Sequence, residues 1–351
     1  MKKSLFFFTL LVAVLVADTS RAQYQNMLSF EQMLDLIHHS KVSYTMNKMA
    51  TDSVQSLAIA ALTQRQRRYT NVPRIVMDHG RPTVTNWVWE GLSPEVDAEV
   101  QKDFSSKDLR AARAEYKKVL KVSPDCYTAV ANLGYCFALE GNSDSAIAYY
   151  DKAIQMSKID YEPYYYKADA LYKAKRYEEA RQAMIDVLTL RPRYAKALML
   201  LHAMPNLGVT VNDSLFAPKA FAFQEANRVL ISFPSDSALE PWKAYAVGKA
   251  IWLGEPAHRD SLTRSSSLSW SVLHEVECCG ALIESYETSR GKLPAQPDLD
   301  KLEAVTADNL LNAYTLYEIG SRFDEDIMLM VDPAIRASVR QYVEKYILPK
   351  S

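Results

Sequence analysis

The sequence predicts an all-α protein, built as a solenoid of stacked helical hairpins that is followed by a further irregular α-helical region. Glycine accounts for only 10 of the 351 residues, which disfavours sheet-rich folds with many tight turns. Apolar residues make up 48% of the chain, which is enough for a packed core. Alanines also recur at a fixed step of 34 residues, at Ala112, Ala146 and Ala180. Such a period is typical of a helical-repeat architecture.

Each 34-residue unit is predicted to contain two helices joined by a turn. Small residues at Gly134 on the first helix and Ala146 on the second let the two backbones approach closely, and the large Tyr150 fills the space beside that contact. Turns are expected at 141–144 and 175–176. One unit cannot bury its apolar face alone, so neighbouring units must stack. Other positions keep the same step: Tyr116, Tyr150 and Met184; Val119, Ala153 and Val187; Leu120, Ile154 and Leu188.

At these positions the sequence resembles the tetratricopeptide repeat family. The family pattern has an aromatic residue, Leu-Gly and a tyrosine on the first helix, then alanine and an aromatic residue on the second, then proline. Residues 127–160 match best and depart from the pattern at Val130 and Lys158. The tetratricopeptide-like region is predicted over 93–204, with a partial repeat at 93–126, repeats at 127–160 and 161–194, and a capping helix from 195.

The resemblance implies a binding groove, because in this family the first helices of successive repeats line a concave surface. The family's groove positions fall on Thr128, Tyr135, Leu139, Glu162, Tyr165, Asp169 and Tyr172. The residues that hold a terminal carboxylate in chaperone-binding relatives are absent, since Ala131 and Tyr135 stand at the matching places. Tyrosines provide broad contact area with a polar tip, so the sequence favours a protein or peptide segment as partner. The alternative is that some of these tyrosines cover neighbouring helices.

The first 22 residues have the layout of a secretory signal peptide. Two lysines precede an apolar run from Leu5 to Ala17, and Ser20 and Ala22 provide the small residues of a cleavage site. A membrane-spanning helix needs about 20 apolar residues, which disfavours the alternative of an uncleaved anchor. The mature chain is expected to be exported by a bacterium to the periplasm or outer membrane, or secreted, without integral insertion into the membrane.

The regions on either side of the repeats are expected to be helical without a clean period. Residues 23–92 are predicted as a helical and extended region, with helices at 29–46 and 53–65. A β-branched stretch at 73–89 fits a short hairpin or an extended segment. Residues 205–351 are predicted as a C-terminal α-helical region, with degenerate repeats as an alternative. Its expected helices are Ala217–Ile231, Leu239–Leu253, Leu268–Ser289, Asp298–Gly320 and Pro333–Ile347.

The sequence contains no motif that identifies a reaction. The glycine-rich phosphate-binding patterns and the hydrolase elbow are absent. His274 and Cys278 lie four residues apart in the stretch HEVECC and would share a helix face. A zinc site needs three or four such ligands, so a metal-dependent helical hydrolase ranks third among the alternatives. No catalytic residue, metal or cofactor is predicted.

The four cysteines are expected to be mostly buried, unpaired thiols. Cys126 and Cys136 are too far apart along a helix to form a bridge, and Cys278 and Cys279 are neighbours that point apart on a helix. A long-range bridge between the two pairs is the alternative, because an exported protein can form disulfides.

Charge and motifs together predict a binding scaffold and not an enzyme. Removal of residues 1–22 leaves 38 basic and 41 acidic residues, which gives no electrostatic footprint for nucleic acid. The favoured function is an exported tetratricopeptide-like scaffold that binds a protein partner through a tyrosine-rich groove, as an accessory subunit of an envelope assembly. The alternative from another class is a glycan-binding protein of the outer membrane or periplasm built on the same kind of helices.

Overall fold

A computed structural model describes residues 26–60, 73–78, 81–86, 109–214, 216–226, 228–263, 271–324 and 326–351. The chain divides into two compact units. Among the described residues, the repeat unit comprises 73–78, 81–86, 109–213, 328–331 and 343–351, and the sheet unit comprises 26–60, 214, 216–226, 228–263, 271–324, 326–327 and 332–342. Helices dominate the described residues of both units, which confirms the predicted mainly all-α class. The predicted signal peptide lies outside the described residues.

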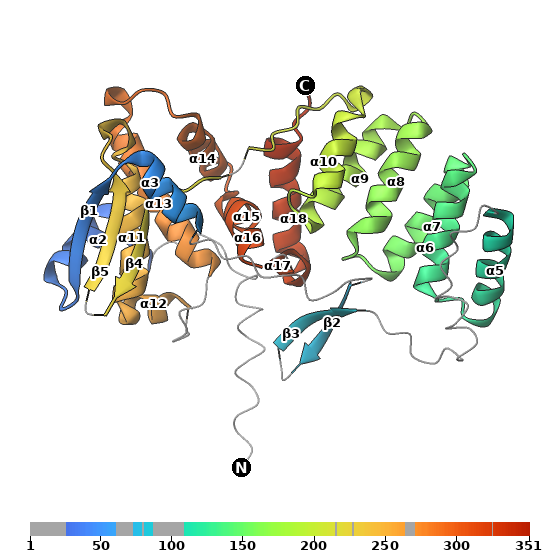
Figure 1. The fold of residues 1–351 in the computed structure, drawn as a ribbon, viewed down its shortest axis with the longest axis horizontal. Helices are drawn as coiled ribbons and strands as arrows, with labels where there is room; N and C mark the ends of the chain where they lie inside the picture. The colour runs from blue at the N-terminus through green and yellow to red at the C-terminus, as the bar shows by residue number, and fades with distance from the viewer. Residues whose placement is uncertain are drawn as a thin grey trace, which may run out of the picture. The chain divides into compact units, whose positions relative to one another are not determined.

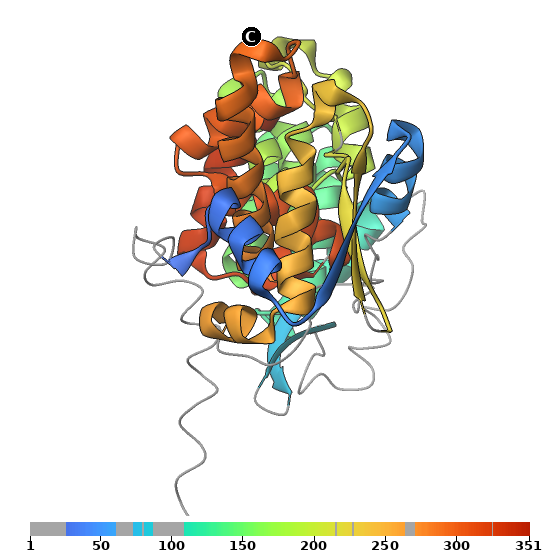
Figure 2. The same cartoon turned by 90° about the vertical axis from the view of Figure 1, so that its left-hand side faces the viewer.

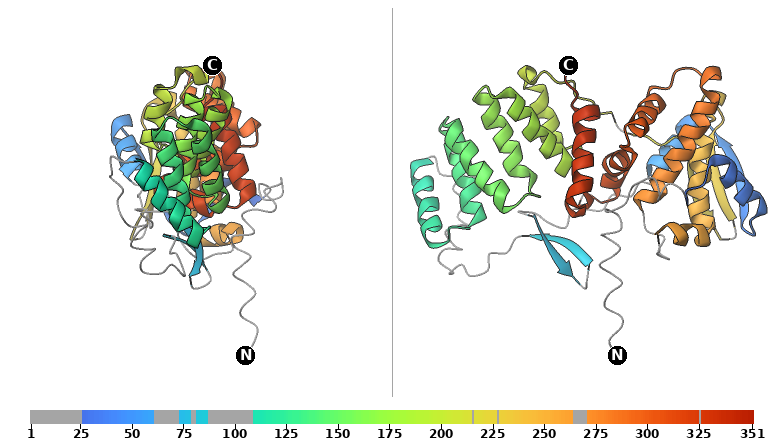
Figure 3. Two further views of the ribbon diagram at one scale, coloured as in Figure 1. Left: turned by 90° about the vertical axis from the view of Figure 1, so that its right-hand side faces the viewer. Right: turned by 180° about the vertical axis from the view of Figure 1, so that it is seen from behind.

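The repeat unit is a row of helices that pack against one another in sequence order, as Figure 1 shows and as the right-hand view of Figure 3 shows from behind. α6 and α7 form one hairpin and α8 and α9 form the next, as the two predicted repeats require. The helices of the row are α5 (Leu109–Val122), α6 (Tyr127–Leu139), α7 (Ser143–Met156), α8 (Tyr161–Lys173), α9 (Tyr177–Leu190) and α10 (Ala195–His202).

The three alanines of the 34-residue period occupy equivalent places. Ala112, Ala146 and Ala180 are each the fourth residue of a 14-residue helix, α5, α7 and α9 respectively. All three are buried. A methyl group at these points leaves room for the backbone of the neighbouring helix, so the period marks the packing contacts of stacked hairpins.

The turns within the hairpins also repeat at the same step. Gly141 and Lys175 each end a first helix with a left-handed backbone, at φ 76° and φ 61°. Glycine adopts this conformation without steric cost, whereas lysine does so against its preference. After the first of these turns, the Asn142 side chain accepts a hydrogen bond from the Ser145 backbone N–H and caps α7. The turn predicted at 175–176 is confirmed, and the one predicted at 141–144 is shorter than expected, because α7 already begins at Ser143.

The C-terminal segment 343–351 packs on the end of the repeat row. The Arg181 guanidinium, which is buried on α9, donates to a Glu344 carboxylate oxygen at 3.0 Å and to the Leu348 carbonyl at 3.1 Å. The backbone N–H of Asn212 donates to the Ile347 carbonyl at 2.9 Å. These bonds engage both terminal nitrogens of a buried guanidinium and join the segment to the last repeat, a role that solenoids commonly give to a capping element.

A short hairpin also belongs to the repeat unit. Strand β2 (Pro73–Asp78) pairs antiparallel with β3 (Arg81–Asn86). The sequence left open a hairpin or an extended segment here, and the structure confirms the hairpin.

The sheet unit contains three strands that the sequence analysis did not predict. β1 (Ser43–Met49) pairs parallel with β5 (Arg228–Pro234), and β4 (Phe221–Glu225) pairs antiparallel with β5, in the order β1-β5-β4. Helix α11 packs against β4 and β5, and α3 lies on the other side of the strands, as Figure 2 shows. The pairing of β1 with β5 joins segments that lie on opposite sides of the repeats in the sequence.

Two helix predictions in this unit are therefore wrong. The helix expected at 29–46 ends at His39, and the helix expected at 217–231 is replaced by β4 and the start of β5. Val229, Ile231 and Phe233 alternate along β5 and are buried on one face, which is the two-residue period of a strand. Because this stretch is rich in aromatic and β-branched residues, strand pairing prevails over its weaker helical pattern. The alternative of a degenerate repeat here is also wrong.

The remaining predicted helices of the sheet unit are present, with breaks, where the structure describes the chain; 61–65 and 268–270 lie outside the described residues. The single helix expected at 298–320 is interrupted at Asn309, which has a left-handed backbone (φ 60°). Among the described residues, every helix is too short or too polar to cross a membrane. The helices of the sheet unit are α2 (Phe30–His39), α3 (Thr51–Ala60), α11 (Trp242–Gly254), α12 (Pro256–Thr263), α13 (Val272–Ser289), α14 (Pro297–Ala307), α15 (Leu311–Thr315) with a π-helical extension (Leu316–Gly320), α16 (Ser321–Phe323) and α18 (Pro333–Tyr342); α17 (Ile327–Met330) runs across the boundary between the units in sequence.

Candidate partner-binding site

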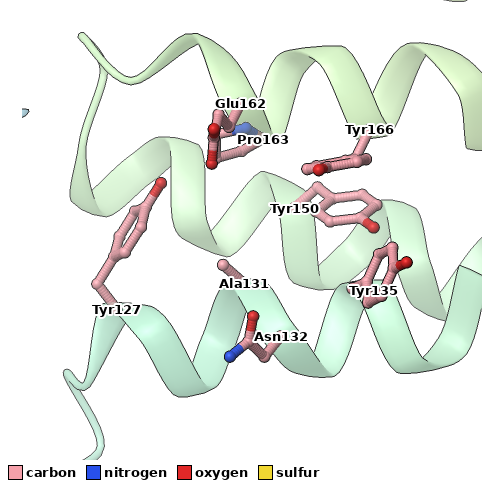
Figure 4. A pocket seen from close by; sticks show the side chains of 8 residues that line it. All are labelled: Tyr127, Ala131, Asn132, Tyr135, Tyr150, Glu162, Pro163 and Tyr166. Carbon is pink, nitrogen blue, oxygen red and sulfur yellow. The ribbon is translucent and has the colours of Figure 1, made fainter. Parts of the chain in front are cut away.

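A pocket of about 230 Å³ lies between the first helices of the two repeats, α6 and α8. Its lining is rich in tyrosine, and Figure 4 shows the side chains arranged around it. The residues that line it are Tyr127, Ala131, Asn132, Tyr135, Tyr150, Glu162, Pro163 and Tyr166. The pocket therefore lies on the helices that the resemblance assigns to partner binding.

Tyr150, on the second helix α7, reaches into this site because Gly134 leaves room for its ring. A β-carbon added at Gly134 would stand 2.7 Å from the Tyr150 Cε1 atom, which is closer than real contacts allow. The glycine is thus required by the tyrosine that crosses it. The Tyr150 ring also stacks on Tyr166, with centroids 6.0 Å apart and planes at 22°.

The rings of the pocket form a connected cluster. Tyr135 meets Tyr166 edge to face, with centroids 5.7 Å apart. Tyr135 is 46% exposed, whereas Tyr127 and Tyr150 are buried. Buried rings fix the shape of the site and an exposed ring provides contact area for a partner.

Two hydrogen-bond donors of the pocket are directed to partners within the repeat unit. The Tyr127 hydroxyl donates to an Asp160 carboxylate oxygen at 2.5 Å, and the Asn132 amide nitrogen donates to the Tyr116 hydroxyl at 2.9 Å. These donors are therefore engaged inside the protein. In Figure 4 the amide oxygen of Asn132 points toward the space between α6 and α8. The Glu162 carboxylate adds a negative charge at the rim of the same pocket.

Burial and negative charge both act on the pocket tyrosines. Burial, and then Asp160, hold the pKa of Tyr127 far above its usual value. Burial is also the main cause of the raised pKa of Tyr150, and for Tyr166 burial is followed by the charge of Glu162. All three phenols are consequently neutral at physiological pH. The negative charge of the site therefore comes from its carboxylates.

The structure brings two of the seven predicted groove residues into the pocket, namely Tyr135 and Glu162. Tyr165 packs instead on Tyr194, with centroids 5.7 Å apart, and Tyr172 packs on Tyr177 at 5.3 Å. The remaining three, Thr128, Leu139 and Asp169, do not line the pocket. Of these, Leu139 is 54% exposed at the end of α6, and Asp169 forms an ion pair with Lys173 at 2.6 Å.

Sequence reasoning missed most of the tyrosines that build the pocket. The face it chose on α8 passes through Glu162 and Tyr165, whereas the pocket uses Glu162 and Tyr166, which are one helical turn apart. Tyr150 was recognised as a packing residue and not as part of a site. Gly134 was the sequence signal for Tyr150. The repeat pattern places the two residues in contact, and a glycine on the first helix indicates that a large side chain packs directly on it.

The HEVECC stretch on α13 forms a buried polar cluster in the sheet unit. Glu275 accepts hydrogen bonds from Tyr245 and Lys249, and Glu277 accepts them from Trp252 and His258. His274 stacks on Trp252, and burial together with Lys249 lowers its pKa well below the usual value. The glutamates are thus engaged by protein donors. Among the residues that the structure describes, no group of three or more His, Cys, Asp or Glu side chains could hold a metal ion.

The cysteines are buried and unpaired. Cys126, Cys136, Cys278 and Cys279 are all free thiols, which confirms the prediction. Burial raises the pKa of each thiol and lowers its reactivity.

Comparison with known proteins identifies a helical-repeat region of the tetratricopeptide class. Two tetratricopeptide repeat models match, one over residues 103–158 and the other over 137–203. The chain is also similar to the small glutamine-rich tetratricopeptide repeat-containing protein 2 of Mycosarcoma maydis, with 37% identity over 94 residues. That alignment covers 25% of each chain. These matches and the packing of α5 to α10 indicate a protein-interaction scaffold.

Proposed function

We propose that this protein is an exported bacterial scaffold that binds a protein segment along the first helices of its repeats, as an accessory subunit of an envelope assembly in the periplasm or at the outer membrane. The observation that carries the binding role is the tyrosine-lined pocket between α6 and α8, which lies within the matched repeats. The export part of the proposal rests on the sequence of residues 1–22.

Exposed side chains of the first helices support protein binding. Tyr135 and Leu139 stand one helical turn apart on α6 and are 46% and 54% exposed. Exposed aromatic and aliphatic groups beside a pocket are typical of the anchors of a protein interface. The mechanism is stoichiometric binding without covalent chemistry.

A single charged substitution is expected to abolish this interaction. Leu139→Asp should reduce retention of the protein partner from a native envelope extract by at least about tenfold, because a buried unpaired carboxylate opposes association. Val122→Asp is the matched control, since Val122 is 73% exposed on the second helix α5 and should retain the partner.

Two results would contradict the proposal. Equal loss for Leu139→Asp and Val122→Asp would show that the first helices are not the binding surface. Retention of no protein by the unmodified chain, together with binding on a glycan array, would favour the alternative of glycan capture.

A further inference from the structure

The pocket between α6 and α8 is complementary to a cation. The Glu162 carboxylate stands at its rim, and the Asp160 carboxylate lies behind it and accepts from Tyr127 and from the Glu162 backbone N–H. Within the described chain, no lysine, arginine or histidine lies within 4 Å of the Glu162 carboxylate. The two lysines of α8 are engaged elsewhere, since Lys167 pairs with Asp151 and Lys173 with Asp169, each at 2.6 Å. Arg191 reaches Glu162 only through the Tyr161 hydroxyl, which accepts from Arg191 and donates to the carboxylate at 3.5 Å.

Aromatic rings add to the preference of the pocket for a cation. The faces of phenol rings carry partial negative charge and attract cations, most strongly where water is excluded. Tyr150 and Tyr166 are stacked, and Tyr135 meets Tyr166 edge to face, so rings of different orientation surround the same space. A cavity of about 230 Å³ is large enough for the end of one long side chain.

A buried hydroxyl without a partner points to a missing ligand. The Tyr150 side chain is 1% exposed, and its hydroxyl makes no hydrogen bond with any residue that the structure describes. Buried polar atoms are nearly always satisfied, so an unsatisfied one needs an explanation. In Figure 4 this hydroxyl points toward Tyr135, whose ring is 46% exposed. A guest that enters the space beside this hydroxyl would supply the missing partner.

We infer that this pocket receives an arginine side chain of the bound protein segment, with its guanidinium among the rings of Tyr135, Tyr150 and Tyr166 and its N–H groups donating to Glu162. Arginine fits better than lysine because its planar group offers five donors and stacks on aromatic rings. The acceptors of the pocket match those donors. This inference rests on the proposed function and names the chemistry of the partner.

The test is a titration of the full chain, labelled with ¹³C in its tyrosine rings, with N-acetyl-arginine methylamide. Saturable shifts are expected for the resonances of Tyr135, Tyr150 and Tyr166. The citrulline analogue has the same shape without the charge and should bind roughly tenfold more weakly. Glu162→Gln should weaken arginine binding by about the same factor. Glu115→Gln, an equal charge change on α5, should leave it unchanged.

The inference is overturned if citrulline binds as well as arginine, if Glu162→Gln and Glu115→Gln behave alike, or if no saturable shift occurs. Thermal melting at the wild-type temperature shows that the Glu162→Gln variant is folded. If arginine does not bind but Leu139→Asp still abolishes partner retention, only this inference is contradicted and the proposed function stands. Arginine binding without any retained protein would remove the proposed function and leave the cation site in place.

Discussion

Replacing Ala146 by leucine is expected to lower the free energy of unfolding of the repeat unit by about 3 kcal/mol, because the added carbons must enter a closely packed contact between helices. Ala146 is completely buried at the fourth position of α7, between the helices α6 and α8 that pack on it. Ala112→Leu and Ala180→Leu should lower the free energy of unfolding by similar amounts, since both alanines occupy the same position in their helices.

Ala148→Leu is the matched control for this prediction. Ala148 lies two residues further along the same helix and is exposed, so its replacement should change stability by no more than about 0.5 kcal/mol. Hydrogen exchange of the amides in α6 to α8, measured by mass spectrometry, reports on this unit separately from the rest of the chain. Equal effects of Ala146→Leu and Ala148→Leu would contradict the repeat packing described above.

Replacing Glu277 by alanine is expected to destabilise the sheet unit by about 4 kcal/mol, since each buried donor left without a partner costs about 1–3 kcal/mol. One Glu277 carboxylate oxygen accepts from the Leu28 backbone N–H at 2.8 Å, and the other accepts from the Trp252 indole N–H at 2.5 Å. His258 lies 3.0 Å from both oxygens. Removal of the carboxylate therefore leaves several groups unsatisfied and opens a cavity between α11 and α13.

Two variants on the same helix separate this effect from a general sensitivity of α13. Glu277→Gln keeps the shape of the side chain and one acceptor oxygen. It should lower the free energy of unfolding by about half as much as Glu277→Ala. Glu287→Ala removes an exposed carboxylate and should be nearly neutral. Urea denaturation combined with hydrogen exchange of α11 and α13 gives the ranking. If Glu277→Ala proves as stable as Glu287→Ala, the buried hydrogen-bond cluster does not hold the unit together.

Local pattern was enough to predict the repeats but not the sheet. The 34-residue period places Ala112, Ala146 and Ala180 at equivalent positions of their helices, and these helices pack on neighbouring segments of the chain. The pairing of β1 with β5 joins residues 43–49 to 228–234, across the whole repeat row. A periodicity measured within one segment carries no information about such a partner, because strand preference depends strongly on tertiary context.

The candidate site was predictable only in part, because local pattern indicates some of its residues and contacts between helices determine the others. Tyr135 and Glu162 follow from the family pattern of the first helices, and the structure places both in the pocket. Tyr150 enters because its ring crosses Gly134, and Tyr166 enters because it stacks on Tyr150. These are contacts between helices, and they depend on distances that spacing along one helix does not give. Burial of Glu277 among Leu28, Trp252 and His258 likewise joins three separate segments.

Site-specific photo-crosslinking tests most directly whether the first helices hold another chain. A benzophenone amino acid would replace Tyr165 on the first helix α8 in one variant and the exposed Ala148 on the second helix α7 in another. Both full-length variants would be produced in the native cells and irradiated there. A protein adduct is expected from position 165 and not from position 148. Adducts of equal yield from both positions, or an adduct from position 148 alone, would contradict binding along the first helices.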